Sequence, residues 1–199
     1  RHLKDIDTFY SCRKFFGVPD GAYLYLSGLD AIDLPLDTSL DRFGHLIKRI
    51  EYGASAGYKD FKENERKLIN QPIKQMSRLT SALLRNIDYE KTKEIRNDNF
   101  FRLHEKLMDF NELSISVGKE SVPMVYPFLS RIPDLRQNLI NRNIFVAQYW
   151  PNVNDWQSDK DSLDVLYSNN LCALPTNQKL SQDDIIYISR QVLKIIKEG

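Results

Sequence analysis

The chain has 199 residues, of which 42% are hydrophobic and 28% are charged, a composition typical of a folded globular protein. Its 28 Lys and Arg residues nearly balance its 27 Asp and Glu residues, which argues against nucleic acid as a partner. No apolar run reaches the roughly 20 residues that cross a bilayer, and the first residues lack the apolar core of a signal peptide. We therefore expect a cytoplasmic protein without a membrane partner. Two distant cysteines and three isolated histidines predict no metal site.

The first part of the chain predicts a loop, a short strand and two helices. Pro19 and Gly21 are typical of a turn, and an aromatic and apolar strand is expected to follow over residues 22–26. Thr38 or Ser39 could cap a helix that runs to about Tyr52. A glycine-rich break then separates this helix from a charged helical stretch over residues 59–68.

Two long helices are expected in the middle of the chain. Pro72 suits the first turn of the first one, whose apolar residues recur every three or four positions and predict one buried stripe: Met76, Leu79, Leu83 and Ile87. Asp88 can cap the second helix, which has a stripe of its own: Phe100, Leu103 and Leu107.

The last 80 residues predict alternating strands and helices. The expected strands are residues 122–128, 144–149 and 171–174, and the expected helices are residues 133–141, 159–169 and 181–195. Ser181 and Asp184 resemble a capping box at the start of the last helix. Helix should exceed strand, and the alternation is typical of a compact α+β layer.

One short segment carries the chemical interpretation. Lys14 stands beside Arg13, and taken alone the pair reads as two solvated basic side chains. The segment from Ser11 to Ala22, however, reads SCRKFFGVPDGA, and it resembles the cofactor-lysine segment of the sugar-aminotransferase (DegT-like) branch of fold-type-I pyridoxal-phosphate (PLP) enzymes. In that branch a Gly-Gly pair follows the lysine by seven and eight residues and begins a strand. Here these positions hold Gly21 and Ala22.

The resemblance implies that the cofactor is PLP. Lys14 would then be both the Schiff-base residue and the general base of transamination. Such an amine must be available in its neutral form, so we expect a desolvated or cation-flanked site that lowers its pKa. Arg13 is expected to lower this pKa or to bind the cofactor phosphate. Ser11 resembles the phosphate-binding serine of these enzymes, with a turn hydroxyl as the alternative, and Gly21 is expected to let the backbone approach the cofactor.

The resemblance spans nearly the whole chain and implies an α/β to α+β fold in three parts. Residues 1–70 would be the end of the large PLP-binding domain and of its sheet. Residues 71–110 would form long linking helices. Residues 111–199 would form a small C-terminal domain with a short sheet packed by helices.

Three other features have competing interpretations. Many members of the branch place an asparagine after a pair such as Gly57-Tyr58, where it reaches the cofactor phosphate of the partner subunit; here that position holds Phe61. Tyr149-Trp150-Pro151 could line a substrate pocket, although a buried strand end is the commoner role. Lys48-Arg49 could touch a phosphate, although a solvated helix face is the commoner role.

The expected function is that of an aminotransferase, with an amino-acid donor and a keto-sugar acceptor, including nucleotide-linked sugars, or another keto acid. Because the chain begins just before Lys14, the groups that bind the PLP ring would lie upstream, and we expect this chain alone to be inactive. A truncated fragment, one half of a split gene and an inactive remnant would each explain this. We expect a homodimer or pairing with the missing N-terminal half. The alternative is a catalytically silent interaction module.

Overall fold

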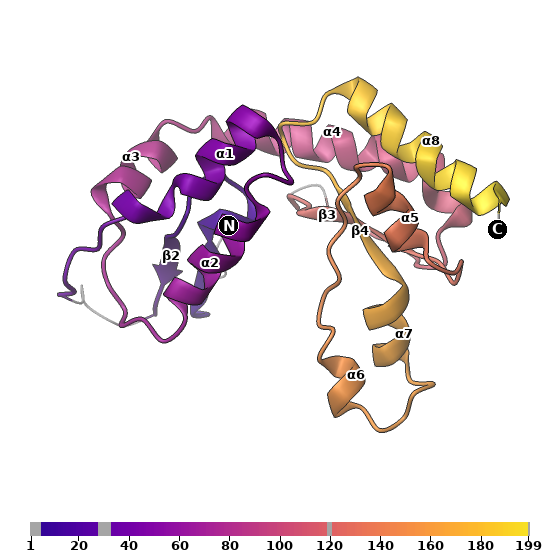
Figure 1. Cartoon of the computed structure of the whole chain (residues 1–199), viewed down its shortest axis with the longest axis horizontal. Coiled ribbons are helices and arrows are strands. Elements are labelled where there is room, and N and C mark those ends of the chain that lie inside the picture. Colours follow the sequence, from indigo (N-terminus) through magenta and orange to yellow (C-terminus); the bar gives the residue numbers. More distant parts are fainter. Residues whose placement is uncertain (1–4, 28–32, 119–120, 199) are drawn as a thin grey trace. The chain divides into compact units, whose positions relative to one another are not determined.

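A computed structural model describes residues 5–27, 33–118 and 121–198, and it divides the chain into two compact units, Arg1–Ile87 and Asp88–Gly199. We call them unit 1 and unit 2. Each combines helices with a two-stranded antiparallel sheet, so the described chain is a mixture of helices and small sheets, compatible with an α+β fold (Figure 1). No helix in the described ranges is both long enough and apolar enough to cross a membrane.

Unit 1 begins with a β-hairpin. Strand β1 (Thr8–Ser11) pairs with β2 (Ala22–Tyr25) in a register that sets Ser11 opposite Ala22. The two strands are joined by the short 3-10 helix η1 (Cys12–Lys14) and by a loop that ends at Gly21. The sequence predicts the second strand, which follows a clear turn signal at Pro19 and Gly21, but not the first.

The remaining named elements of unit 1 are helical. They are η2 (Leu40–Arg42), α1 (Gly44–Tyr52), α2 (Tyr58–Leu68) and α3 (Arg78–Arg85). The predicted glycine-rich break is confirmed: Gly53, with a φ of 89°, follows the last residue of α1. A Cβ atom on Gly57 would lie 2.5 Å from the carbonyl oxygen of His45, so α1 and the start of α2 approach at a distance that only glycine permits.

The helix expected from Pro72 begins six residues later, at Arg78. Residues before it are extended instead, because Gln75 forms a parallel bridge with Leu36 and exchanges backbone hydrogen bonds with the 35–37 segment. Ser77 then caps α3 by accepting a hydrogen bond from the backbone N–H of Thr80. The predicted buried stripe is wrong at its centre: Thr80 and Leu84 face the interior of unit 1, whereas Leu79 and Leu83 are exposed.

Unit 2 is built on two long helices and a short sheet. The sheet pairs β3 (Val125–Leu129) with β4 (Leu171–Pro175), and helix α4 (Tyr89–Leu107) packs against α8 (Gln182–Glu198). The shorter elements are η3 (Met108–Phe110), α5 (Leu135–Asn141), α6 (Val153–Trp156) and α7 (Leu163–Asn170). The predicted α4 stripe of Phe100, Leu103 and Leu107 is buried in the core of this unit.

Helix caps in unit 2 follow the sequence pattern closely. Asp88 accepts a hydrogen bond from the backbone N–H of Lys91 at the start of α4. At the start of α8, the backbone N–H of Ser181 donates to the Asp184 carboxylate at 2.8 Å, and the Asp184 N–H donates back to the Ser181 hydroxyl at 3.2 Å. Both predicted caps, including the capping box, are confirmed.

Several element boundaries in unit 2 differ from the prediction. The helix expected from Pro133 begins at Leu135, and the one expected from Asp159 begins at Leu163, where Ser162 provides the cap. The expected strand 144–149 is not a named strand: it meets β4 through a single bridge between Ala147 and Ala173. Asn143 and Trp150, at the two ends of this segment, both have positive φ, which limits the straight run available for pairing.

Candidate functional site

Lys14 is the last residue of η1, directly after the first strand of the hairpin. Its side chain is exposed, whereas Cys12 and Val18 on either side of it are buried in the small core of unit 1. The desolvated site expected around this amine is therefore not formed by the described part of the chain.

The other two predicted cofactor-binding residues flank Lys14. Ser11 ends β1 and is half-buried. Arg13 is also half-buried, and its guanidinium forms a salt bridge with Glu65 on α2. This charge-assisted ion pair holds the Arg13 guanidinium in position.

Helix α2 holds the Lys14 loop at a second point. Asn64, which is buried, donates a hydrogen bond of 3.0 Å to the backbone carbonyl of Pro19. Together with the pair between Glu65 and Arg13, this bond fixes both ends of the loop to two consecutive residues of α2. Sequence reasoning missed both residues because nothing in a charged helix marks which side chains will turn inward.

A buried polar cluster lies at the far end of the same loop. Asp20 accepts hydrogen bonds from the Ser39 hydroxyl at 2.7 Å, the Thr80 hydroxyl at 2.6 Å and the Arg42 guanidinium at 2.8 Å. Ser39 was a candidate helix cap, but it makes no cap bond and joins this cluster instead. Arg42 also pairs with Asp37 at 2.6 Å and thereby lowers the pKa of that carboxyl. Residues 37–42 and Thr80 of α3 are thus tied to the Lys14 loop.

Gly21 closes the loop in a conformation suited to glycine. Its φ is 90°, and a Cβ atom there would lie 2.9 Å from Cγ2 of Thr80 and 3.2 Å from Cε of Met76. The close approach that we expected of Gly21 is therefore made to side chains of unit 1 itself. Ala22, which replaces the second glycine of the family pattern, begins β2 and needs no such freedom.

Two of the remaining candidates in unit 1, Lys48 and Phe61, have structural partners. Lys48 pairs with Asp60 at 2.5 Å, which agrees with a helix-face role. Phe61 stacks on Tyr58 and lies against the ring of His45. Burial lowers the pKa of His45, so this ring is biased toward its neutral form.

Arg96 and Asn99 of α4 are buried in unit 2. Arg96 donates to the Gln178 side chain at 2.9 Å and to the carbonyls of Pro123 and Met124 at 3.3 Å. Burial lowers its pKa to about 10. Asn99 donates to the carbonyl of Asn177. Both residues join α4 to the loops beside the sheet, which is an architectural role.

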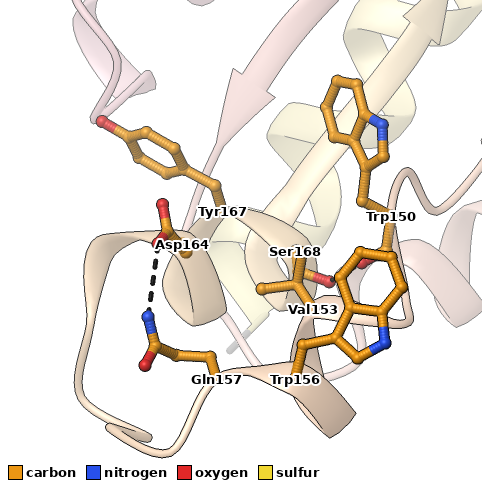
Figure 2. A pocket seen from close by; sticks show the side chains of 7 residues that line it. All are labelled: Trp150, Val153, Trp156, Gln157, Asp164, Tyr167 and Ser168. Carbon is orange, nitrogen blue, oxygen red and sulfur yellow. Dashed lines mark hydrogen bonds between the residues drawn. The ribbon is translucent and has the colours of Figure 1, made fainter.

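A second candidate site lies in unit 2, at Tyr149-Trp150-Pro151, the segment for which the sequence left two interpretations: a substrate pocket or a buried strand end. Trp150 lines a hollow of about 370 Å³ together with Trp156, Gln157, Asp164 and Tyr167. Figure 2 shows the two indole rings along one side of this hollow and Gln157 and Asp164 along the other. Trp150 is exposed, so it is not a buried strand end, and a substrate pocket at this place stays a prediction.

Comparison with known proteins adds no family assignment. A scan against protein-family models and a search of curated proteins both found no match to this chain. The chemical interpretation therefore depends on the segment from Ser11 to Ala22 and on the arrangement just described.

Proposed function

We propose that this chain is the part of a PLP-dependent aminotransferase that carries the cofactor lysine, Lys14. The single observation that carries the proposal is the segment from Ser11 to Ala22, with a glycine seven residues after the lysine. The acceptor would be a keto-sugar, including nucleotide-linked ones, and the donor an amino acid. The finer fold assignment, to fold type I, belongs to this proposal, as do a dimeric enzyme and a cytoplasmic location.

The residues around Lys14 support the proposal by the chemistry that they offer. When bound, PLP supplies an electron sink for the carbon that loses its proton. Lys14 Nζ would hold the cofactor covalently and would carry that proton. Ser11 would hold the phosphate. Arg13, fixed by Glu65, would add positive charge beside the amine. The Asp20 cluster and Asn64 would keep the loop in one conformation.

The test is covalent labelling of the chain with PLP. The protein is incubated with PLP, reduced with borohydride and digested, and the modified peptide is identified by mass spectrometry. We expect the label on Lys14, and we expect Lys14→Ala to lose it. Lys59→Ala is the matched control, because Lys59 is an exposed lysine of α2 and should leave the labelling of Lys14 unchanged.

If label spreads evenly over exposed lysines and Lys14→Ala reduces it only by one lysine's share, this chain alone does not direct PLP to Lys14. The same experiment with an N-terminally extended protein separates a missing cofactor pocket from a wrong assignment. If the extended protein also leaves Lys14 unlabelled, the aminotransferase assignment is wrong.

A catalytically silent interaction module is the second candidate. It is favoured by the apolar side chains that the hairpin leaves in contact with solvent: Phe9 is 73% exposed, and Leu24, directly opposite in the register, is 58% exposed. This candidate predicts a stable oligomer whose native mass is the same with and without PLP. The aminotransferase proposal predicts that mass spectra with PLP contain the bound cofactor.

A further inference from the structure

The hollow in unit 2 is lined by the tryptophans of this protein. The chain contains two, Trp150 and Trp156, and both line the same hollow of about 370 Å³. Trp150 is 68% exposed and Trp156 is 79% exposed. Large aromatic side chains usually contribute their area to a core, so two exposed indoles on one side of a cavity point to a ligand that covers them (Figure 2).

The backbone holds Trp150 in an uncommon conformation. Its φ is 51°, a left-handed value that bulky residues rarely adopt. The carbonyl of Trp150 accepts two hydrogen bonds of 3.0 Å, one from the Ser168 hydroxyl and one from the backbone N–H of Val153. These bonds connect Trp150 to both helices that flank the hollow. The surroundings thus fix a strained residue whose side chain lines the cavity.

The opposite side of the hollow combines the ring of Tyr167 with polar and negative groups. Asp164 and Gln157 lie there, with the Gln157 amide 3.4 Å from the carboxylate (Figure 2). Among the described residues that line the hollow, Asp164 carries the formal charge, and no lysine or arginine is present to neutralise it.

The segment around the hollow adds to this negative charge. Residues 155–164 contain four aspartates and one lysine, Lys160. The Lys160 ammonium donates to the carbonyls of Asn154 at 2.6 Å and Gln157 at 3.0 Å, so backbone oxygens engage it. An anionic ligand would be repelled here, and a neutral one would make no use of the excess charge.

We infer that this hollow binds an extended organic cation, a linear aliphatic diamine or polyamine. One ammonium group would lie over the indole faces, whose negative quadrupole attracts cations. A second would reach the Asp164 carboxylate across the hollow through a charge-assisted hydrogen bond. The methylene groups between them would cover Val153. A compact cation would satisfy one side alone, whereas the two indole rings and the Asp164 carboxylate lie on opposite sides.

This inference does not depend on Lys14 or on PLP, because every residue that it uses belongs to unit 2. The test is titration of the whole 199-residue chain with spermidine, followed by intrinsic tryptophan fluorescence. Both fluorophores line the proposed site, so the signal reports it directly. We expect a saturable change in emission. Hexane-1,6-diol, which has a similar methylene chain and no charge, should produce none at the same concentrations.

Two matched variants locate the site. Asp164→Asn removes the charge that lines the hollow, and we expect spermidine to bind roughly fivefold more weakly. Asp161→Asn removes the same charge from the same segment, outside the lining, and should change affinity by less than about twofold. Trp156→Leu keeps Trp150 as a reporter and should also weaken binding. Thermal unfolding of each variant confirms that the fold is retained.

Three results would overturn the inference. Equal weakening by Asp161→Asn and Asp164→Asn would mean general attraction to an acidic loop. An equal response to the diol would mean an apolar site. A saturable response to a neutral saccharide, with none to spermidine, would make the hollow a carbohydrate site.

Discussion

At the residue scale, Gly21 combines a left-handed φ of 90° with a Cβ position only 2.9 Å from Thr80. We expect Gly21→Ala to lower the free energy of unfolding of unit 1 by about 1–3 kcal/mol, since alanine is strained at this φ and displaces the Thr80 methyl group. Urea denaturation followed by far-UV circular dichroism measures the change.

The matched control for this variant is Gly44→Ala. Gly44 is the first residue of α1, and a Cβ atom there meets no other atom within 4 Å. Alanine should therefore be neutral or stabilising by up to about 1 kcal/mol. Equal destabilisation by both substitutions would show that the Gly21 geometry is not what matters.

The ion pair between Asp37 and Arg42 makes a prediction about pH. Arg42 lowers the pKa of Asp37 below its ordinary value of 3.8, chiefly through a side-chain hydrogen bond. A carboxyl with a depressed folded-state pKa stabilises the fold fully above its unfolded-state pKa, and this contribution is lost as the pH falls through the lower folded-state value. Unit 1 should therefore lose stability on acidification below about pH 4.

Asp37→Asn tests this assignment. The variant should be less stable than the parent at pH 6, and its urea midpoint should fall less steeply between pH 5 and pH 2, which are roughly the limits of carboxyl titration. Asp41→Asn is the control, because Asp41 is an exposed neighbour in η2. If Asp41→Asn flattens the pH profile as much as Asp37→Asn, the ion pair is not the cause.

At the element scale, the start of α8 depends on two side chains. The Ser181 hydroxyl accepts from the Asp184 N–H, and the Asp184 carboxylate accepts from the Ser181 N–H. We expect Ser181→Ala to lower the stability of unit 2 by about 1 kcal/mol, because one of the unpaired N–H groups of the first turn loses its acceptor. Thermal unfolding followed by tryptophan fluorescence measures this loss.

Ser158→Ala is the matched control for the cap, since Ser158 is an exposed residue of the loop before α7. It should change the midpoint of unit 2 by no more than a few tenths of a kcal/mol. A Ser181→Ala midpoint equal to that of Ser158→Ala would mean that the cap contributes nothing to stability.

The two caps also show which elements a sequence can predict. A cap is set by residues three positions apart, so Asp88 and the pair of Ser181 and Asp184 were recognisable without a structure. The buried face of α3 could not be recognised from the sequence in this way. The spacing of Leu79 and Leu83 is that of a buried stripe, yet Thr80 faces inward because it donates to Asp20, 60 residues away.

Of the residues at the candidate site, some could be recognised from the sequence and others could not. Lys14, Arg13 and Gly21 were recognisable because a short contiguous pattern contains them. The residues that hold the loop were not, because Asn64 bonds to a carbonyl 45 residues away and Glu65 pairs with a residue 52 positions away. Contacts of this range depend on tertiary packing, which leaves no periodic trace in the chain.

At the scale of the whole molecule, the two units differ in how much apolar surface they bury. Fifteen buried residues form one cluster in unit 2, from Phe100 to Ile195. Among the described residues of unit 1, the corresponding cluster has three: Cys12, Val18 and Leu84. Because apolar burial is the dominant stabilising contribution, unit 1 by itself should be the less stable of the two.

The two tryptophans make this difference measurable in the intact chain. Both belong to unit 2, whereas both units contain helices that contribute to far-UV circular dichroism. We expect ellipticity to begin to fall at a urea concentration at which tryptophan emission is still native, since unit 1 should unfold first. Residues 88–199 expressed alone should keep the later transition, because the fifteen-residue core lies entirely within them. Coincident transitions in the intact chain, together with an unfolded 88–199 fragment, would mean instead that the two units depend on each other for stability.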